Sequence, residues 1–123
     1  MIIGVGADLV AVERIERALA RSPRFASRVF QLSEMEETAG SATRLAARFA
    51  AKEAWLKAMG IPLFAAPLTD IVVACGADGR PAMRLRDKAA DLSRARGVQT
   101  IHLSLSHDRG YALAFVMLEG DRP

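Results

Sequence analysis

Residues 48–57 read Arg-Phe-Ala-Ala-Lys-Glu-Ala-Trp-Leu-Lys. This run lies inside a longer segment of helix-forming residues without proline, 43–59, and Gly60 follows the segment as a stop. The sequence therefore predicts a helix over residues 43–59. Within that helix, Glu53 and Lys57 are one turn apart and lie on the same face.

Glu53 has two interpretations at this stage. Glu53 and Lys57 have the i, i+4 spacing of an ion pair that stabilises a helix at its surface. Alternatively, Glu53 is a functional carboxylate held among cations, because Arg48 precedes it by five residues and alanines keep the shared face small. The helix alone favours the surface ion pair.

The composition is typical of a folded protein of modest charge. The chain has 123 residues, of which 51% are hydrophobic and 25% are charged, so we expect one domain over residues 1–123. The net charge of +3 suits an acidic or phosphorylated partner without demanding nucleic acid. No nucleic-acid partner is therefore predicted.

Two features favour the cytoplasm. The apolar N-terminus has no basic leader and reaches Asp8 within a few residues, too soon for a signal peptide or a membrane span. Cys75 is the only cysteine, so the chain can form neither an internal disulfide nor a thiolate-rich metal site. We therefore expect a cytoplasmic protein that does not enter a membrane.

The apolar pattern predicts an α+β domain. Segments with alternating or β-branched residues predict strands, two of which flank a turn as a hairpin. Helical spacing predicts helices, one of them capped by Ser33. Together they give a small antiparallel sheet with helices packed on one side. The predicted strands are 2–7, 70–75, 82–85, 100–106 and 111–118, and the predicted helices are 12–19, 32–37, 43–59 and 87–96.

Asp8 directly follows the first predicted strand. A carboxylate in this position suits Mg²⁺, which takes one or two carboxylates and leaves its other positions to water and phosphate oxygens. Asp8 equally suits the N-cap of the helix that follows. The residues alone leave both alternatives open.

Three motifs follow one another along this short chain. They are Gly6-Ala7-Asp8, the helix motif at 48–57, and Ser104-Leu105-Ser106-His107. Each motif alone is unspecific, but the three in this order resemble the holo-acyl-carrier-protein synthase family. Members of that family are 4'-phosphopantetheinyl transferases. The resemblance covers nearly the whole chain and implies the fold of the family.

The resemblance implies a substrate, coenzyme A, and a metal, Mg²⁺. Asp8 and Glu53 would hold the metal at the pyrophosphate of coenzyme A, and Lys57 would neutralise phosphate charge as a third catalytic residue. Arg48 and His107 would bind the 3'-phosphate end of coenzyme A. The serine hydroxyl of an apo acyl carrier protein would attack the phosphorus, and adenosine 3',5'-bisphosphate would leave. Either a metal-bound water or Glu53 would take the serine proton, and the sequence leaves this open.

The resemblance also implies a partner and an assembly. The predicted helix at 12–19 has a basic edge, whose arginines are either ordinary solvated surface or a docking face. Arg14 and Arg21 are predicted to dock an acidic acyl carrier protein. Val10 stands where larger, monomeric relatives commonly have a second acid, which indicates the short branch that forms homotrimers with sites between subunits. Gly60-Ile61-Pro62 replaces the Gly-Thr-Gly turn that many members have.

Two rival functions use the same residues. A non-catalytic nucleotide- or RNA-binding module would use the basic surface, but the seven aromatic residues are not interleaved with a basic strand face. A Mg²⁺-dependent nuclease would use the two carboxylates and the lysine. The order of the motifs favours the transferase.

Overall fold

The structure is a computed structural model that describes residues 1–121 of the 123-residue chain. Its elements in chain order are β1 (Ile2–Ala11), α1 (Val12–Arg21), α2 (Pro23–Val29), α3 (Leu32–Thr38), α4 (Ala42–Met59), the 3-10 turn η1 (Leu68–Asp70), β2 (Ile71–Cys75), β3 (Pro81–Leu85), α5 (Asp87–Ala95), β4 (Val98–Asp108) and β5 (Tyr111–Gly120).

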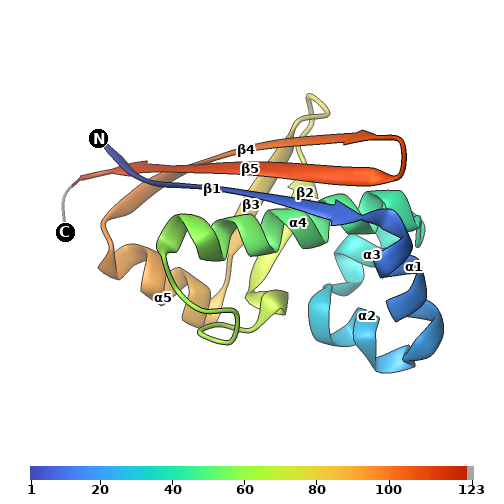
Figure 1. The fold of residues 1–123 in the computed structure, drawn as a ribbon. Coiled ribbons are helices and arrows are strands. Elements are labelled where there is room, and N and C mark those ends of the chain that lie inside the picture. The colour runs from blue at the N-terminus through green and yellow to red at the C-terminus, as the bar shows by residue number, and fades with distance from the viewer. Residues whose placement is uncertain (122–123) are drawn as a thin grey trace.

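The predicted α+β class with antiparallel strands and helices on one side is confirmed (Figure 1). The strands form two sheets, however, where the sequence predicted one. One sheet has the order β1-β5-β4, and the other is the hairpin β2-β3 alone. Apolar alternation identifies strands and their buried faces but does not identify their partners. The hairpin was therefore predictable as a unit, and its separation from the larger sheet was not.

Helix α4 lies across the larger sheet and forms the centre of the core (Figure 1). Ser41 caps its start by accepting a hydrogen bond from the Arg44 backbone N–H at 3.4 Å. Gly60 ends it in the left-handed conformation with a φ of 68°. The sheet covers one side of α4, and α3 and β2 cover another, so most of the helix is buried.

Strand β1 approaches α4 closely through Gly4 and Gly6. A Cβ atom added at Gly4 would lie 2.0 Å from the carbonyl oxygen of Ala58, and one added at Gly6 would lie 2.1 Å from that of Ala54. Both distances are far shorter than any real contact, so only glycine fits here. Asp8 lies two residues further along the same face of β1, and the close approach therefore brings it to α4.

The structure excludes the helix cap as one of the two alternatives for Asp8, and the predicted Ser33 cap is wrong. Asp8 lies inside β1, which continues to Ala11, and α1 begins only at Val12, so Asp8 caps no helix. Gln31, rather than Ser33, precedes α3, and the Gln31 backbone N–H donates to the Glu34 carboxylate at 3.0 Å. Strand pairing extends β1 beyond Asp8, and the Glu34 carboxylate moves the cap of α3 two residues before Ser33.

The sheet face opposite α4 is apolar and exposed. Because residues alternate along β1 and β5, the side chains not used against α4 gather on this open face. Its exposed apolar residues include Val5, Leu9, Tyr111, Leu113 and Phe115.

No helix within residues 1–121 is both long and apolar enough to cross a membrane.

We expect Gly6→Ala to destabilise the protein. The added methyl group would meet the Ala54 carbonyl, a backbone group that cannot move aside, so β1 and α4 must separate. Overpacking of this kind costs about 1–3 kcal/mol of unfolding free energy. Urea unfolding followed by circular dichroism measures it, and a midpoint equal to that of the wild type would contradict the close approach.

Candidate active site

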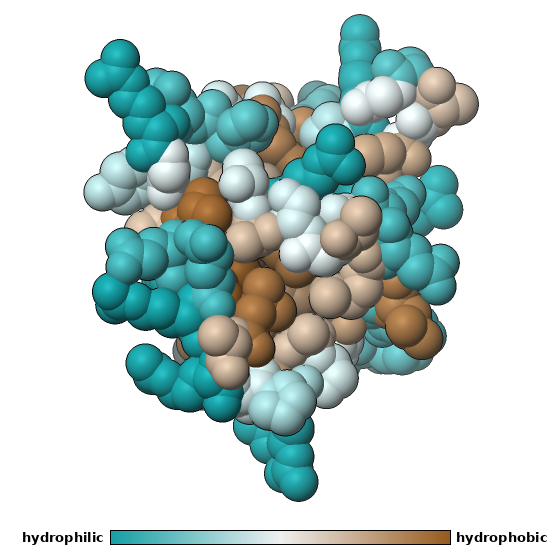
Figure 2. Space-filling view, turned by 90° about the vertical axis from the view of Figure 1, so that its right-hand side faces the viewer, coloured by the Kyte–Doolittle hydropathy of each residue, from teal (hydrophilic) through white to brown (hydrophobic). Residues whose placement is uncertain are grey.

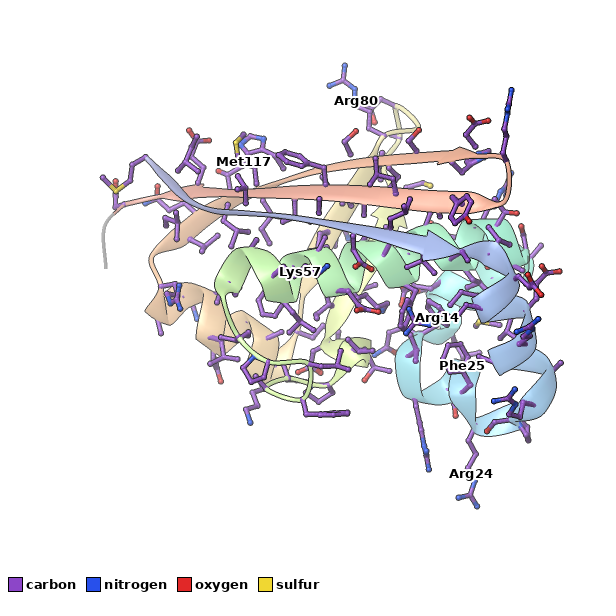
Figure 3. All side chains as sticks on the ribbon, viewed as in Figure 1. Arg14, Arg24, Phe25, Lys57, Arg80 and Met117 are labelled. Carbon is purple, nitrogen blue, oxygen red and sulfur yellow. The ribbon has the colours of Figure 1, made fainter. Side chains whose placement is uncertain are left out.

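Asp8, Glu53 and Lys57 come together where β1 crosses the C-terminal half of α4. The ammonium of Lys57 donates a hydrogen bond to Oδ1 of Asp8 at 2.8 Å and to the Ala7 carbonyl at 3.2 Å. Figure 3 shows Lys57 on the side of α4 that faces β1. The helix and the strand thus place two carboxylates and one cation at a single position.

The predicted surface ion pair between Glu53 and Lys57 does not form. Lys57 pairs with Asp8, and the cation within ion-pair distance of Glu53 is Arg14 of α1, whose Nη2 lies 3.9 Å from Oε1. A partner on a distant strand thus replaces the partner at i, i+4. The spacing within one helix could not reveal this, because β1 reaches α4 only through the close approach at Gly4 and Gly6.

The two carboxylates keep oxygens that have no hydrogen-bond partner. Oδ2 of Asp8 and Oε1 of Glu53 are buried and accept no hydrogen bond from residues 1–121. The Asp8 and Glu53 side chains are only 11% and 19% exposed, so water does not fully compensate either oxygen. The two carboxylates also repel each other electrostatically, and two unsatisfied oxygens on such a pair fit a hard divalent cation such as Mg²⁺.

The protein would supply only these two ligands. No group of three or more His, Cys, Asp or Glu side chains within residues 1–121 is arranged to hold a metal. Mg²⁺ typically binds through one or two carboxylates together with waters and substrate phosphates. The residues present therefore suit a site that a phosphorylated substrate completes.

Burial and neighbouring charges shift the pKa values of Glu53 and Lys57. Burial raises the pKa of Glu53, and the neighbouring Asp8 carboxylate raises it further, while Arg14 and Lys57 act in the opposite direction. The hydrogen bond to Asp8 raises the pKa of Lys57. Glu53 therefore becomes a better proton acceptor near neutral pH, and Lys57 remains a cation.

The basic edge of α1 runs from Glu53 to an apolar cavity. Arg14 lies at the Glu53 end, with its guanidinium carbon 5.2 Å from the centre of the Phe49 ring (Figure 3). Arg21, near the end of α1, lines a cavity of about 690 Å³ between α1, α2 and the loop after α4. In the view that faces this end of the molecule, hydrophilic side chains project around an apolar centre (Figure 2).

Arg48 does not join the Asp8–Glu53 cluster. It is 5% exposed, and its guanidinium donates to the Glu34 carbonyl at 3.1 Å and to the Glu37 carboxylate at 3.0 Å. Five helical positions correspond to a rotation of about 140° around α4, so Arg48 and Glu53 point in different directions. Lys57 acts electrostatically on Glu53, but Arg48 is not one of the cations around it, and a role of Arg48 toward coenzyme A stays a prediction.

His107 is exposed near the end of β4. It lies opposite Ala112 of β5, whereas Asp8 lies opposite Ala114 on the other side of β5. A whole strand therefore separates His107 from the strand that carries Asp8. Its predicted contact with coenzyme A stays a prediction.

Sequence reasoning missed Lys52 and Glu34. Both side chains are completely buried, and the Lys52 ammonium donates to Glu34 Oε1 at 2.8 Å. The signal for burial was present, because Lys52 lies three residues after Phe49 and four before Leu56, on the apolar face of the predicted helix. The partner was not predictable, since Glu34 belongs to another helix.

Comparison with known proteins decides the family. The sequence profile of the 4'-phosphopantetheinyl transferase superfamily matches residues 4–116. The chain belongs to this superfamily. A holo-[acyl-carrier-protein] synthase of Anaeromyxobacter sp. (strain K) is 48% identical over 130 aligned positions, which cover 100% of both chains. The predicted resemblance and the predicted enzyme class, a phosphopantetheinyl transferase, are confirmed.

Solved structures of relatives share the fold. The holo-[acyl-carrier-protein] synthase of Neisseria meningitidis superposes with a TM-score of 0.88 at 32% identity, over 97% of this chain and 99% of that one. The enzyme of Helicobacter pylori, solved in complex with coenzyme A, gives a TM-score of 0.85 at 28% identity, over 94% of this chain and 99% of that one. The superfamily fold therefore extends over nearly the whole chain.

Proposed function

We propose that this transferase moves 4'-phosphopantetheine from coenzyme A to a serine of an apo acyl carrier protein, with Mg²⁺ as cofactor. The carrying observation is the pair of buried carboxylate oxygens of Asp8 and Glu53 without partners, beside the Lys57 cation. The relative solved with coenzyme A supports the choice of substrate. Cys75, a free cysteine, is compatible with a reducing cytoplasm, where we place the reaction.

Asp8 and Glu53 would hold the metal, and Lys57 would bind phosphate. When bound, Mg²⁺ would neutralise charge on the pyrophosphate of coenzyme A. The Lys57 side chain is more than half exposed, so its ammonium can exchange one acceptor for a phosphate oxygen that arrives from solvent. The chain thus contributes position and positive charge, the main requirements of phosphoryl transfer.

Glu53 would act as the general base. The bond between the serine oxygen and phosphorus forms while the bond from phosphorus to adenosine 3',5'-bisphosphate breaks, and the serine proton passes to Glu53. Glu53 suits this step because its second carboxylate oxygen, Oε2, would remain for the proton when Oε1 holds the metal. No covalent enzyme intermediate is required.

Incubation with coenzyme A, Mg²⁺ and an apo carrier protein tests the function. We expect mass spectrometry to detect one phosphopantetheinyl group on the carrier serine. Asp8→Ala and Glu53→Ala should each reduce the rate by at least about a thousandfold, because each removes half of the metal site. Asp91→Ala, which removes an exposed carboxylate on α5, should leave the rate unchanged.

The outcome also separates the rival functions. Cleavage of RNA or DNA without carrier modification would indicate a Mg²⁺-dependent nuclease. Nucleotide binding without either reaction would indicate a binding module. Folded Asp8→Ala and Glu53→Ala variants with normal transfer would exclude the proposed metal site.

Helix α1 would dock the carrier. Arg14 lies within 4 Å of Glu53, so an acidic partner that follows the arginines along α1 would bring its serine close to the two carboxylates. Arg21 then meets the partner at the apolar cavity, where a hydrophobic side chain of the carrier fits. Charged contacts at the rim act mainly on encounter and orientation.

We expect charge reversal on α1 to weaken the carrier interaction. Arg14→Glu together with Arg21→Glu should raise the KM for the carrier about tenfold or more at low salt and flatten its salt dependence. Arg21→Glu alone separates docking from any effect on Glu53, and Arg94→Glu on α5 is the matched control. A KM unchanged at low salt would assign these arginines to ordinary surface.

The active unit would be a homotrimer with sites between subunits. The open sheet face exposes a continuous apolar surface, which association would bury. His107 is exposed and does not join the Asp8–Glu53 cluster of its own chain. A neighbouring subunit could therefore supply it to coenzyme A, whereas Arg48 is buried within its own chain.

Light scattering should report three chains at assay concentration. Mixing Asp8→Ala chains with His107→Ala chains under subunit exchange should restore part of the activity if the two residues serve one site from different subunits. A fully active monomer would refute the trimer. Failure of complementation in an intact trimer would place both residues of each site in one chain.

A further inference from the structure

Small side chains make up part of the buried surface of α4. Six buried positions carry only a methyl group: Ala46, Ala47, Ala50, Ala51, Ala54 and Ala58. Helices normally resist rotation about their axes because their side chains form ridges that fit the grooves of neighbours. These alanines form shallow ridges that give little steric resistance to a small rotation, whereas the large buried side chains of α4, among them Leu45, Trp55 and Met59, resist it by packing. A directional restraint in addition to this packing would define the angle at which Glu53 and Lys57 face β1.

The close contact with β1 fixes distance more than angle. Gly4 and Gly6 bring the strand against backbone carbonyls of α4 and have no side chains to interlock with the helix. The separation between helix and strand is therefore tightly defined. Rotation of α4 requires a restraint on another side.

Lys52 supplies directional bonds on that other side. Its ammonium donates to Glu34 Oε1 at 2.8 Å, to the Leu68 carbonyl at 2.9 Å and to the Ile71 carbonyl at 2.7 Å. All three donors of the ammonium are used. The acceptors belong to α3, η1 and β2, so one side chain ties α4 to three separate elements.

Glu34 is itself held in place. Its Oε1 also accepts from the Gln31 backbone N–H at 3.0 Å, and its Oε2 accepts from the Val73 backbone N–H at 3.1 Å. Both Lys52 and Glu34 are completely buried. The acceptor of the ammonium is thus fixed by the backbone of two elements, and a buried, fully bonded pair of this kind is rigid.

We infer that Lys52 is a positioning residue that sets the rotation of α4 and so places Glu53 and Lys57 against Asp8. Glu53 is the next residue on the same helix, and its carboxylate lies about 5–6 Å from the helix axis. A rotation of about 10° would move that carboxylate by about 1 Å. A displacement of this size costs about a hundredfold in rate at a site that depends on position.

The alternative is that the buried pair serves stability alone. Replacing both members of a buried ion pair with neutral groups of similar volume is often neutral for stability. The double variant Lys52→Met with Glu34→Gln therefore separates the two roles, because it keeps the volume and removes the charged hydrogen bonds. The side-chain amide that Glu34→Gln introduces would still offer an oxygen to the Val73 N–H.

The experiment compares this double variant with the wild type and with Leu45→Val. Leu45 is fully buried on α4, so its truncation loosens the core of the same helix while Lys52 keeps its three bonds. We expect the double variant to lower kcat about 10- to 100-fold, with a carrier KM within about twofold of the wild type. We also expect its Mg²⁺ affinity, measured by calorimetry without substrate, to fall several-fold. Leu45→Val should change neither quantity.

The inference rests on the proposed function, on the transfer for its kcat readout and on the metal site at Asp8 and Glu53 for its Mg²⁺ readout. If the wild type transfers nothing, the proposed transfer fails, while the Mg²⁺ affinities still test the positioning. A folded double variant with wild-type kcat and Mg²⁺ affinity would overturn the inference, even with a lowered Tm. Should the double variant not fold, Lys52→Gln with Glu34→Gln, which leaves no charge buried, replaces it and is expected to lower kcat by a smaller factor. An unchanged kcat and Mg²⁺ affinity would again overturn the inference.

Discussion

The close approach of β1 to α4 is the constraint on which the site depends. A methyl group at Gly4 or Gly6 would lie about 2 Å from a helix carbonyl, so the strand reaches the helix only because both residues lack a side chain. This approach brings Asp8, from the start of the chain, to Lys57, from its middle. Ordinary side chains at the two glycines would hold the strand and the helix further apart. The carboxylates would then be too far from each other to share a cation.

Lys52 and Glu53 are neighbours on α4, but only the charge of Lys52 is fully hydrogen-bonded within the chain. The Lys52 ammonium meets three acceptors, and both oxygens of its partner Glu34 accept hydrogen bonds, so this group of charges is satisfied within the chain. Glu53, the next residue, keeps a buried oxygen without a donor and lies beside a second carboxylate. Selection for stability alone would not leave a buried carboxylate oxygen without a hydrogen bond. Buried polar groups that lack a partner occur mainly at functional sites.

The sequence predicted what depends on local pattern. The bounds of α4 agree with the prediction to within one residue, because Gly60 and the run of helix formers act locally. The predicted partner of Lys57 was wrong. Helical spacing favours Glu53, while the real partner, Asp8, lies on a strand 49 residues away. The separation of β2-β3 from the larger sheet was missed for the same reason. Pairing between distant segments depends on the three-dimensional packing, which apolar periodicity does not encode.

The helical period places the charged residues of the motif at 48–57 on two different faces of α4. Arg48 and Lys52 are four residues apart and both reach Glu34, while Glu53 and Lys57 are also four residues apart and face β1. The centres of the two pairs lie about 140° apart around the axis, so a contiguous stretch presents one charged pair to the core and another to β1. Contiguity in sequence therefore does not imply a shared site. The rigid helix nevertheless couples the two pairs. Any rotation of α4 that breaks the bonds of Arg48 and Lys52 to Glu34 also displaces Glu53 and Lys57.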